Sequence, residues 1–277
     1  MTTTRTPKPA TAPKLDPKSR GQGWGHYPLF ALAFVGLALF VLPLLGLVVR
    51  APLTKLGALF TTPALLEALR LSLVVSLAAV TLSLILGLPC AWVLARYRFP
   101  GRGLVRALLT LPMVLPPVVA GVALLATFGR RGLFGPAIEW LGVDLAFSTT
   151  GAVLAATFVA APFLILSCEA ALENVDPRLE AAAATLGASR LRILWTVTLP
   201  TIRPSLLAGL SLCWARALGE FGATITFAGN FQGRTQTMPL AVYETLQSDH
   251  DGALLLSLIL LAVSLTILIA LRGELRR

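Results

Sequence analysis

Charge is scarce in this sequence. Charged residues make up 13% of its 277 residues and hydrophobic residues 56%, with a mean hydropathy of +0.80. Soluble globular chains carry about 25% charged and about 45 to 50% apolar residues. The composition therefore excludes a soluble globular protein and predicts a membrane protein. Aromatic residues are few as well, at 8%, and the apolar surplus of Leu, Ala and Val favours packed helices over a β-barrel.

Lysine, histidine and cysteine are also scarce, and each shortage excludes a kind of site. None of the four lysines follows a glycine, so no phosphate-binding GxxxxGK(S/T) loop exists and we expect no ATP hydrolysis by this chain. The two histidines, His26 and His250, leave no Ser/His or metal site inside the membrane. The three cysteines lie far apart in apolar stretches. We therefore expect no intramembrane enzyme, no metal and no cofactor bound by this chain.

What is present is a series of charge-poor intervals, each long enough to cross a bilayer core with about 20 apolar residues. Six occur, and only the fifth contains charge, at Arg216 and Glu220. The sequence predicts an all-α protein with six transmembrane helices. The first interval is retained, because it is too long for a signal peptide and lacks a cleavage site. The prolines at the start of the third are expected to break its hydrogen-bond ladder. The intervals are residues 28–49, 71–95, 107–129, 145–168, a fifth that begins near Pro204, and 252–271.

Lysine and arginine lie mainly on one side of these spans. The tail, the second and fourth loops and the C-terminus hold 16 of them, and the opposite side holds 6. Since basic loops stay in the cytoplasm, both termini and the long fourth loop are predicted to be cytoplasmic. The net charge of +10 reflects this bias, and we do not expect nucleic-acid binding. Residues 1–27, rich in proline and lysine, are predicted to be a disordered basic tail that contacts anionic membrane lipid.

The fourth loop, residues 172–203, is too long for a simple connection between helices. Asp176, followed by proline, is a typical helix N-cap, Glu180 suits the first turn, and Gly187 is a natural left-handed stop. Ser189 can cap a second segment. A short, alanine-rich amphipathic helix is therefore predicted on the cytoplasmic face. Such a helix could lie on the lipid surface, but its narrow alanine face suits a groove in a protein partner better.

Two short sequence motifs occur in this loop at a defined spacing. Residues 180–187 read EAAAATLG, and after nine further residues VTLP follows at 197–200. This pattern resembles the EAA loop of permease subunits in bacterial ABC importers, the element that docks into the ATPase subunit. In that register the family's glutamate position falls on Ala181 and the acidic residue lies one place earlier, at Glu180, while Val197 replaces the usual Ile. The resemblance implies that ATPase coupling involves Glu180, Ala181, Ala182, Ala183, Leu186 and Gly187.

The resemblance extends from about Leu65 to the C-terminus. LPMVLPPVV at 111–119, ARALGEFGATITF at 215–227 and GRTQTMP at 233–239 look like the permease subunits of molybdate importers. This implies a MetI-like ABC permease bundle over residues 65–272, preceded by an extra transmembrane helix at 28–49. It also implies an inner-membrane machine of two permease copies, two ATPase subunits that use ATP and Mg, and an external oxyanion-binding protein. The same machine for tungstate or for sulfate or thiosulfate is the nearest alternative. An ion-coupled secondary transporter is a remote one, against which the alanine-rich helix argues.

The charged fifth span has two interpretations. Arg216 and Glu220 are four residues apart, so they would share one helix face and could pair inside the membrane. The pair either neutralises itself or takes part in the translocation pathway or gate. Thr224 and Thr226 would add neutral donors, which suit an anion that must be released again. Glycines in this segment permit close helix approach across a symmetric pair of permeases.

Overall fold

The computed structural model describes residues 27–60 and 62–275. All regular elements within these ranges are helical, and they contain no strand. The chain divides into two units, residues 1–49 and residues 50–277. Residues 1–26 of the predicted basic tail lie outside the described residues.

The first unit contains all but the last residue of α1, Tyr27–Arg50. The 24 residues of this helix follow the first predicted span closely. At 1.5 Å per residue such a helix is about 36 Å long, which is enough for a hydrocarbon core of about 30 Å. Pro43 lies within the helix, a position that membrane helices tolerate better than soluble ones.

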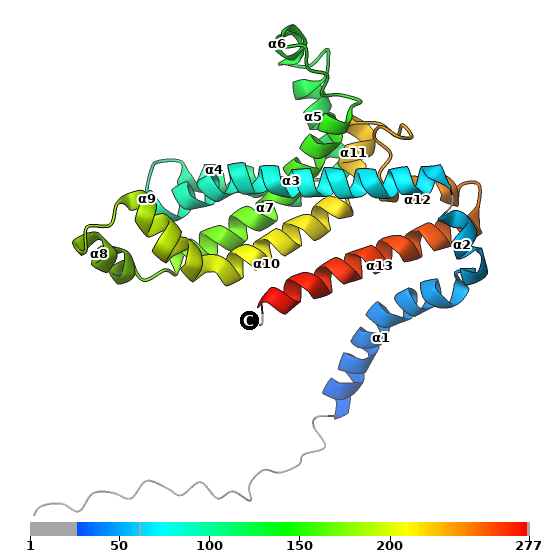
Figure 1. Cartoon of the computed structure of the whole chain (residues 1–277), viewed down its shortest axis with the longest axis horizontal. Coiled ribbons are helices and arrows are strands. Elements are labelled where there is room, and N and C mark those ends of the chain that lie inside the picture. Colours follow the sequence, from blue (N-terminus) through cyan, green and yellow to red (C-terminus); the bar gives the residue numbers. More distant parts are fainter. Residues whose placement is uncertain (1–26, 61, 276–277) are drawn as a thin grey trace, which may run out of the picture. The chain divides into compact units, whose positions relative to one another are not determined.

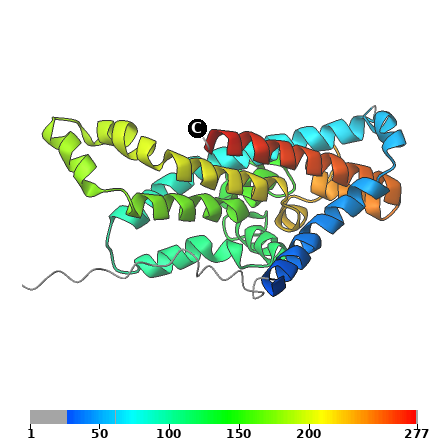
Figure 2. The same cartoon turned by 90° about the horizontal axis from the view of Figure 1, so that it is seen from below.

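The second unit is a bundle in which the long helices run alongside one another (Figures 1 and 2). Helices α5 and α6 project from it (Figure 1). Helix α7 packs against both α3 and α10, and α13 packs against α10 and α12. In chain order the elements of this unit are η3 (Leu53–Lys55), α2 (Leu56–Leu59), α3 (Pro63–Arg96), α4 (Arg102–Thr110), η4 (Leu111–Met113), α5 (Pro117–Phe128), α6 (Gly135–Trp140), α7 (Thr149–Glu173), α8 (Pro177–Thr185), α9 (Arg190–Ile193), the π-helix η5 (Leu194–Thr198), α10 (Leu199–Leu218), α11 (Gly222–Phe227), α12 (Met238–Leu246) and α13 (His250–Leu275).

Small residues bring the central helices together. Helix α3 buries a stripe of Ala, Ser and Gly at helical spacing, and α7 buries a run of alanines. Such faces let helix backbones approach closely where lipid supplies no hydrophobic drive. The serines of this stripe also accept hydrogen bonds from neighbouring elements. Trp214 of α10 donates from Nε1 to Ser76 Oγ at 2.9 Å. Similarly, the backbone N–H of Met238 donates to Ser72 Oγ at 2.7 Å. The stripe on α3 therefore holds α10 and the start of α12.

The third predicted span is not one continuous helix. The segment from Arg102 to Met113 meets α5 at an angle of 115°. Pro116 has the extended backbone of φ −54° and ψ 132°, and Pro117 is the first residue of α5. A proline cannot donate to the ladder and disfavours helical backbone in the residue before it. The break therefore lies between Met113 and Pro117, among the prolines that were predicted to interrupt this span.

Five helices of the described residues are long and apolar enough to span a membrane, and there are six spans if the bent pair is one of them. The second span is longer than predicted, because α3 begins at Pro63 and includes Glu67 and Arg70 in its first turns. At the same end of the unit, Lys55 Nζ lies 2.7 Å from Asp251 Oδ2. This hydrogen bond and the carboxylate charge raise the pKa of Lys55 above its usual value.

Candidate functional site

Helix α8 has both of the ends that the sequence predicts. Asp176 caps it by accepting a hydrogen bond from the backbone N–H of Arg178 at 2.9 Å. Gly187 has a φ of +80°, and the N–H groups of Gly187 and Ala188 donate to the carbonyls of Ala184 and Ala183. This pair of bonds is a Schellman motif. No atom lies within 4 Å of the Cβ position of Gly187, so the glycine is required by its backbone conformation and not by space.

Most of the predicted coupling residues are exposed on this helix. Ala181, Ala182, Leu186 and Gly187 face outward, and Leu186 is 89% exposed. Ala183 is half-buried. The large exposed apolar side chains of the loop are Leu179, Leu186, Leu191 and Trp195. They give α8 a largely apolar outer surface, whereas the segment after it also exposes Arg190 and Arg192.

Glu180 differs from the other predicted coupling residues, because its carboxylate points back into the chain. Its Oε1 accepts hydrogen bonds from Arg96 Nη2 at 2.6 Å and from Thr198 Oγ1 at 2.8 Å. The Arg96 guanidinium also lies 5.5 Å from the ring centroid of Trp92, within the range of a cation–π contact. Neither Arg96 nor Thr198 was predicted as a partner of Glu180. In the sequence, nothing distinguishes Arg96 from the other basic residues of the loops.

A second group of charges joins α4 to the end of α7. Arg106 donates to Glu169 from Nε at 2.9 Å and also from Nη2. Arg102 donates to Glu173 at 2.5 Å, and Arg106 reaches the same carboxylate at 3.1 Å. Glu169 is 3% exposed. This cluster was not predicted from the sequence, although the two arginines, like the two glutamates, are four residues apart and so share a helix face.

Arg216 and Glu220 do pair, but they do not share a helix face as predicted. Helix α10 ends at Leu218 with Gly219 as its C-cap, and Glu220 lies in the break before α11. Arg216 Nη1 is 2.6 Å from Glu220 Oε2, with the side chains 28% and 2% exposed. Glu220 Oε1 also accepts from the N–H of Ala223 at 2.7 Å. Glu220 therefore accepts from an N–H at the start of α11 that has no partner within the helix. Through this bond and its pair with Arg216, it connects the end of α10 to the start of α11.

The two threonines lie on α11, which packs against α5. Thr224 is 1% exposed, and half-buried Thr226 donates to the Gly222 carbonyl at 2.9 Å. A Cβ on Gly222 would lie 2.6 Å from Pro117 Cβ, and one on Gly121 would lie 2.6 Å from Thr226 Cβ. The glycines of this segment were predicted to allow close approach between two permease copies. Gly222 instead makes its close contact within one chain, against Pro117.

Gly219, the other glycine of the predicted close approach, is not part of such a contact. The atom nearest to its Cβ position is the Ala215 carbonyl oxygen, at 3.6 Å. It is the C-cap of α10, where its φ of −89° and ψ of 9° are open to any residue.

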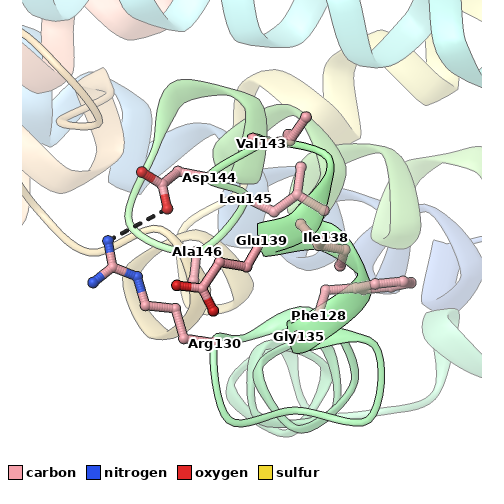
Figure 3. A pocket seen from close by; sticks show the side chains of 10 residues that line it. Phe128, Arg130, Gly135, Ile138, Glu139, Val143, Asp144, Leu145 and Ala146 are labelled. Atoms are coloured by element: carbon pink, nitrogen blue, oxygen red, sulfur yellow. Dashed lines mark hydrogen bonds and ion pairs between the residues drawn. The ribbon is translucent and has the colours of Figure 1, made fainter.

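A cavity of about 310 Å³ lies beside α6 (Figure 3). Helix α6 itself lies away from α8 (Figure 1). Arg130 Nη2 pairs across it with Asp144 Oδ1 at 3.3 Å, and Glu139 lies on its wall (Figure 3). One cation and two carboxylates give an anion no net attraction. Among the residues that the structure describes, no group of three or more His, Cys, Asp or Glu could hold a metal ion.

Comparison with known proteins gives consistent matches. Residues 83–275 match the family described as binding-protein-dependent transport system inner membrane component. The molybdenum transport system permease protein ModB of Mycobacterium bovis is 44% identical over 241 residues, 87% of this chain and 90% of that protein. The protein of the same name from Escherichia coli K12 is 47% identical over 202 residues, covering 72% and 88%. The sulfate transport system permease protein CysT of Salmonella typhimurium is 36% identical over 245 residues, covering 87% and 88%.

The fold also matches a solved structure. A chain of a bacterial ABC transporter involved in the import of the acidic polysaccharide alginate superposes with a TM-score of 0.72 at 19% identity, over 91% of this chain and 96% of that one. At that identity the likeness shows the fold alone. The family match includes all of α7 to α13 with the α8 loop between them. The chain therefore belongs to the binding-protein-dependent transport system inner-membrane components, and it is a multi-pass protein of the inner membrane.

Proposed function

We propose that this chain is the permease subunit of an ATP-driven importer that moves molybdate across the inner membrane. The observation that carries the ATP-driven part is α8, a helix capped at both ends that presents an apolar, largely exposed face. The cargo follows from the relatives, since identity to the two molybdenum permeases is 44% and 47% against 36% for the sulfate permease.

The proposed machine contains two copies of this chain, two ATPase subunits and an external oxyanion-binding protein. The α8 loop and both termini are cytoplasmic, in accordance with the division of basic residues. Ala181, Ala182, Leu186 and Gly187 enter a groove of the ATPase, where small side chains allow close approach. The chain itself is not an enzyme and binds no cofactor. ATP and Mg are used by the ATPase.

The pathway candidates divide by burial. Arg216 is partly exposed and Thr226 is half-buried, and we expect these two to meet the anion, whereas Glu220 and Thr224 are buried and would support them. Glu220 partly cancels the charge of Arg216. A dianion crossing beside such a pair is attracted weakly enough to be released, as conduction requires.

Uptake into vesicles tests the function. Vesicles with this chain, the cognate ATPase and the binding protein should take up molybdate only when ATP is present, and those without the ATPase should not. Uptake driven by an ion gradient in the absence of the ATPase would show a secondary transporter instead. A higher rate with sulfate or tungstate would keep the machine and change its cargo.

Gly187 tests the docking role of α8 separately. A β-branched residue is strained in left-handed backbone by at least about 1 kcal/mol, whereas asparagine tolerates it. Gly187→Val should insert normally but weaken co-purification with the ATPase and abolish uptake, and Gly187→Asn should retain both. Normal ATPase capture and uptake by Gly187→Val would refute the docking assignment.

A further inference from the structure

Glu180 is the predicted coupling residue whose side chain bonds to other parts of the same chain. We propose that Glu180 is a positioning residue that ties α8 to α3 and to the start of α10, so that a displacement of α8 reaches the membrane helices. This proposal rests on the proposed function, in which α8 docks into an ATPase. It differs from a direct contact between Glu180 and the ATPase, in which the carboxylate would face outward.

The contact joins three elements at one oxygen atom. Arg96 is the last residue of α3, Glu180 lies in the first turn of α8, and Thr198 is the last residue of the π-helix that leads into α10. Arg96 and Thr198 donate to the same Oε1. The Arg96 and Glu180 side chains are only 21% and 24% exposed. Hydrogen bonds between charged groups are shorter and stronger than neutral ones, and partial burial limits their screening by salt.

Apart from this contact, α8 packs only loosely, against α9 and η5. None of its nine residues, all of which the structure describes, is buried. Its covalent connections are the short turn after α7 and the bend at Gly187. A helix without a buried face can turn or slide when a partner pulls on it, unless a directed contact holds it. The Glu180 contact is the directed bond that the structure supplies between the α8 side chains and the ends of α3 and α10.

The behaviour of the neighbouring threonines supports this role. Thr196 and Thr201 donate to the carbonyls four residues earlier, Arg192 and Val197, as threonines in helices commonly do. Thr198 is fully buried and donates to Glu180 instead. It lies in a π-helix, and such turns are frequent at functional sites. The π-turn therefore coincides with the point at which α8 is attached.

The test separates ATPase capture from coupling. Glu180→Gln removes the charge of the carboxylate, and Thr198→Val removes one donor while leaving the ion pair. Two matched controls exist. Asp176→Asn neutralises a carboxylate at the same helix start but keeps a capping oxygen, and Thr201→Val removes a hydroxyl that donates to the backbone carbonyl four residues earlier and makes no bond to α8. For each variant we would measure co-purification with the ATPase, ATP hydrolysis, and molybdate uptake per ATP hydrolysed.

We expect ATPase capture and hydrolysis to stay within about twofold of the parent protein in all four variants. Uptake per ATP should fall about tenfold in Glu180→Gln and about threefold in Thr198→Val, and should not change in the controls. The double variant Arg96→Glu/Glu180→Arg restores the ion pair with its charges exchanged and should recover much of the loss. This recovery would distinguish a positioning role from general damage to the loop.

Two results would overturn the proposal. If Glu180→Gln loses the ATPase while Asp176→Asn keeps it, Glu180 contacts the ATPase directly. If uptake per ATP is unchanged in both Glu180→Gln and Thr198→Val, the contact transmits nothing. Should Glu180→Gln fail to insert, Thr198→Val decides by itself. Failure of the proposed function is separate, because the parent protein would then show no ATP-driven uptake before any variant is made.

Discussion

Helices α5 and α11 meet through glycines, whereas the helices at the α8 end meet through charges. In the first region, Gly121 and Gly222 bring two short helices so close that a single added carbon would overlap its neighbour. In the second region, which comprises α4, α8, η5 and the C-terminal ends of α3 and α7, carboxylates of α7 and α8 accept from arginines and a threonine.

The two kinds of contact respond differently to movement. Close packing has a steep distance dependence, and a gap of 0.5 to 1 Å already forfeits about a quarter to a half of the attraction. Charge interactions fall off slowly with distance, and flexible arginine side chains can follow a moving carboxylate. The α5–α11 contact is therefore suited to stay fixed, and the α8 end is suited to change its geometry when a partner binds.

The largest effect on stability is expected at the contact between α5 and α11. In Gly222→Leu the new Cβ would lie 2.6 Å from Pro117 Cβ and 3.2 Å from the Val118 nitrogen, so α5 and α11 must separate. Overpacking of this kind costs about 1 to 3 kcal/mol, or more where backbone must move. Thermal unfolding and the monodisperse fraction in detergent would measure the loss. Gly219→Leu is the control, with no atom closer than 3.6 Å, and equal damage in both would refute the packing role.

The next effect sharpens the description of the α8 end. Glu169→Gln removes a buried charge that faces Arg106, and we expect a loss of about 1 to 3 kcal/mol. This is less than for a fully buried pair, because the Arg106 side chain is 43% exposed. Glu173→Gln, at a carboxylate that is 42% exposed, should cost at most about 1 kcal/mol. Denaturant unfolding compares the two, and an equal loss would show that burial does not determine the strength of this cluster.

The Arg216–Glu220 pair lies next to the fixed contact and tests whether a charge there is structural. Arg216→Leu leaves the nearly buried Glu220 charge without its partner, so assembly should fall. Adding Glu220→Gln removes that charge and keeps an acceptor for the Ala223 N–H, so assembly should recover by about 1 to 3 kcal/mol. Uptake should stay low in the double variant if Arg216 meets the anion. Full uptake would exclude an essential pathway role for either charge.

The smallest effect is expected at Lys55, whose pair with Asp251 is exposed to solvent. Lys55→Gln should leave stability at neutral pH unchanged within error, in contrast to Glu169→Gln. Asp251 raises the pKa of Lys55 above 10.5, so any stabilisation is present below that pH and is lost as pH rises through the raised pKa. Unfolding of both proteins between about pH 7 and about pH 11 measures this. A large difference at pH 7 would contradict the comparison.

The ends of α8 could be predicted because they depend on neighbours in the sequence. Asp176 and Gly187 act on backbone groups within a few residues, and the residue types alone specify the cap and the stop. The break after Leu218 could not be predicted in the same way. Glycines in membrane helices serve either for packing or for ending a helix, and nothing in the sequence distinguishes Gly219 from Gly222. The structure assigns the first to the helix end and the second to the contact with Pro117.

The sequence by itself determined that the chain is helical, that it crosses the membrane several times and that a short capped helix lies between the fourth and fifth spans. These features follow from composition, from periodicity and from bonds between residues close in the chain. Only the tertiary structure decided that Glu180 pairs with Arg96, 84 residues away, and that Arg106 pairs with Glu169, 63 residues away. The physical reason is that a charge has the same appearance in the sequence whether it faces a partner protein or its own fold. Which of these it does depends on where the helix packing places it.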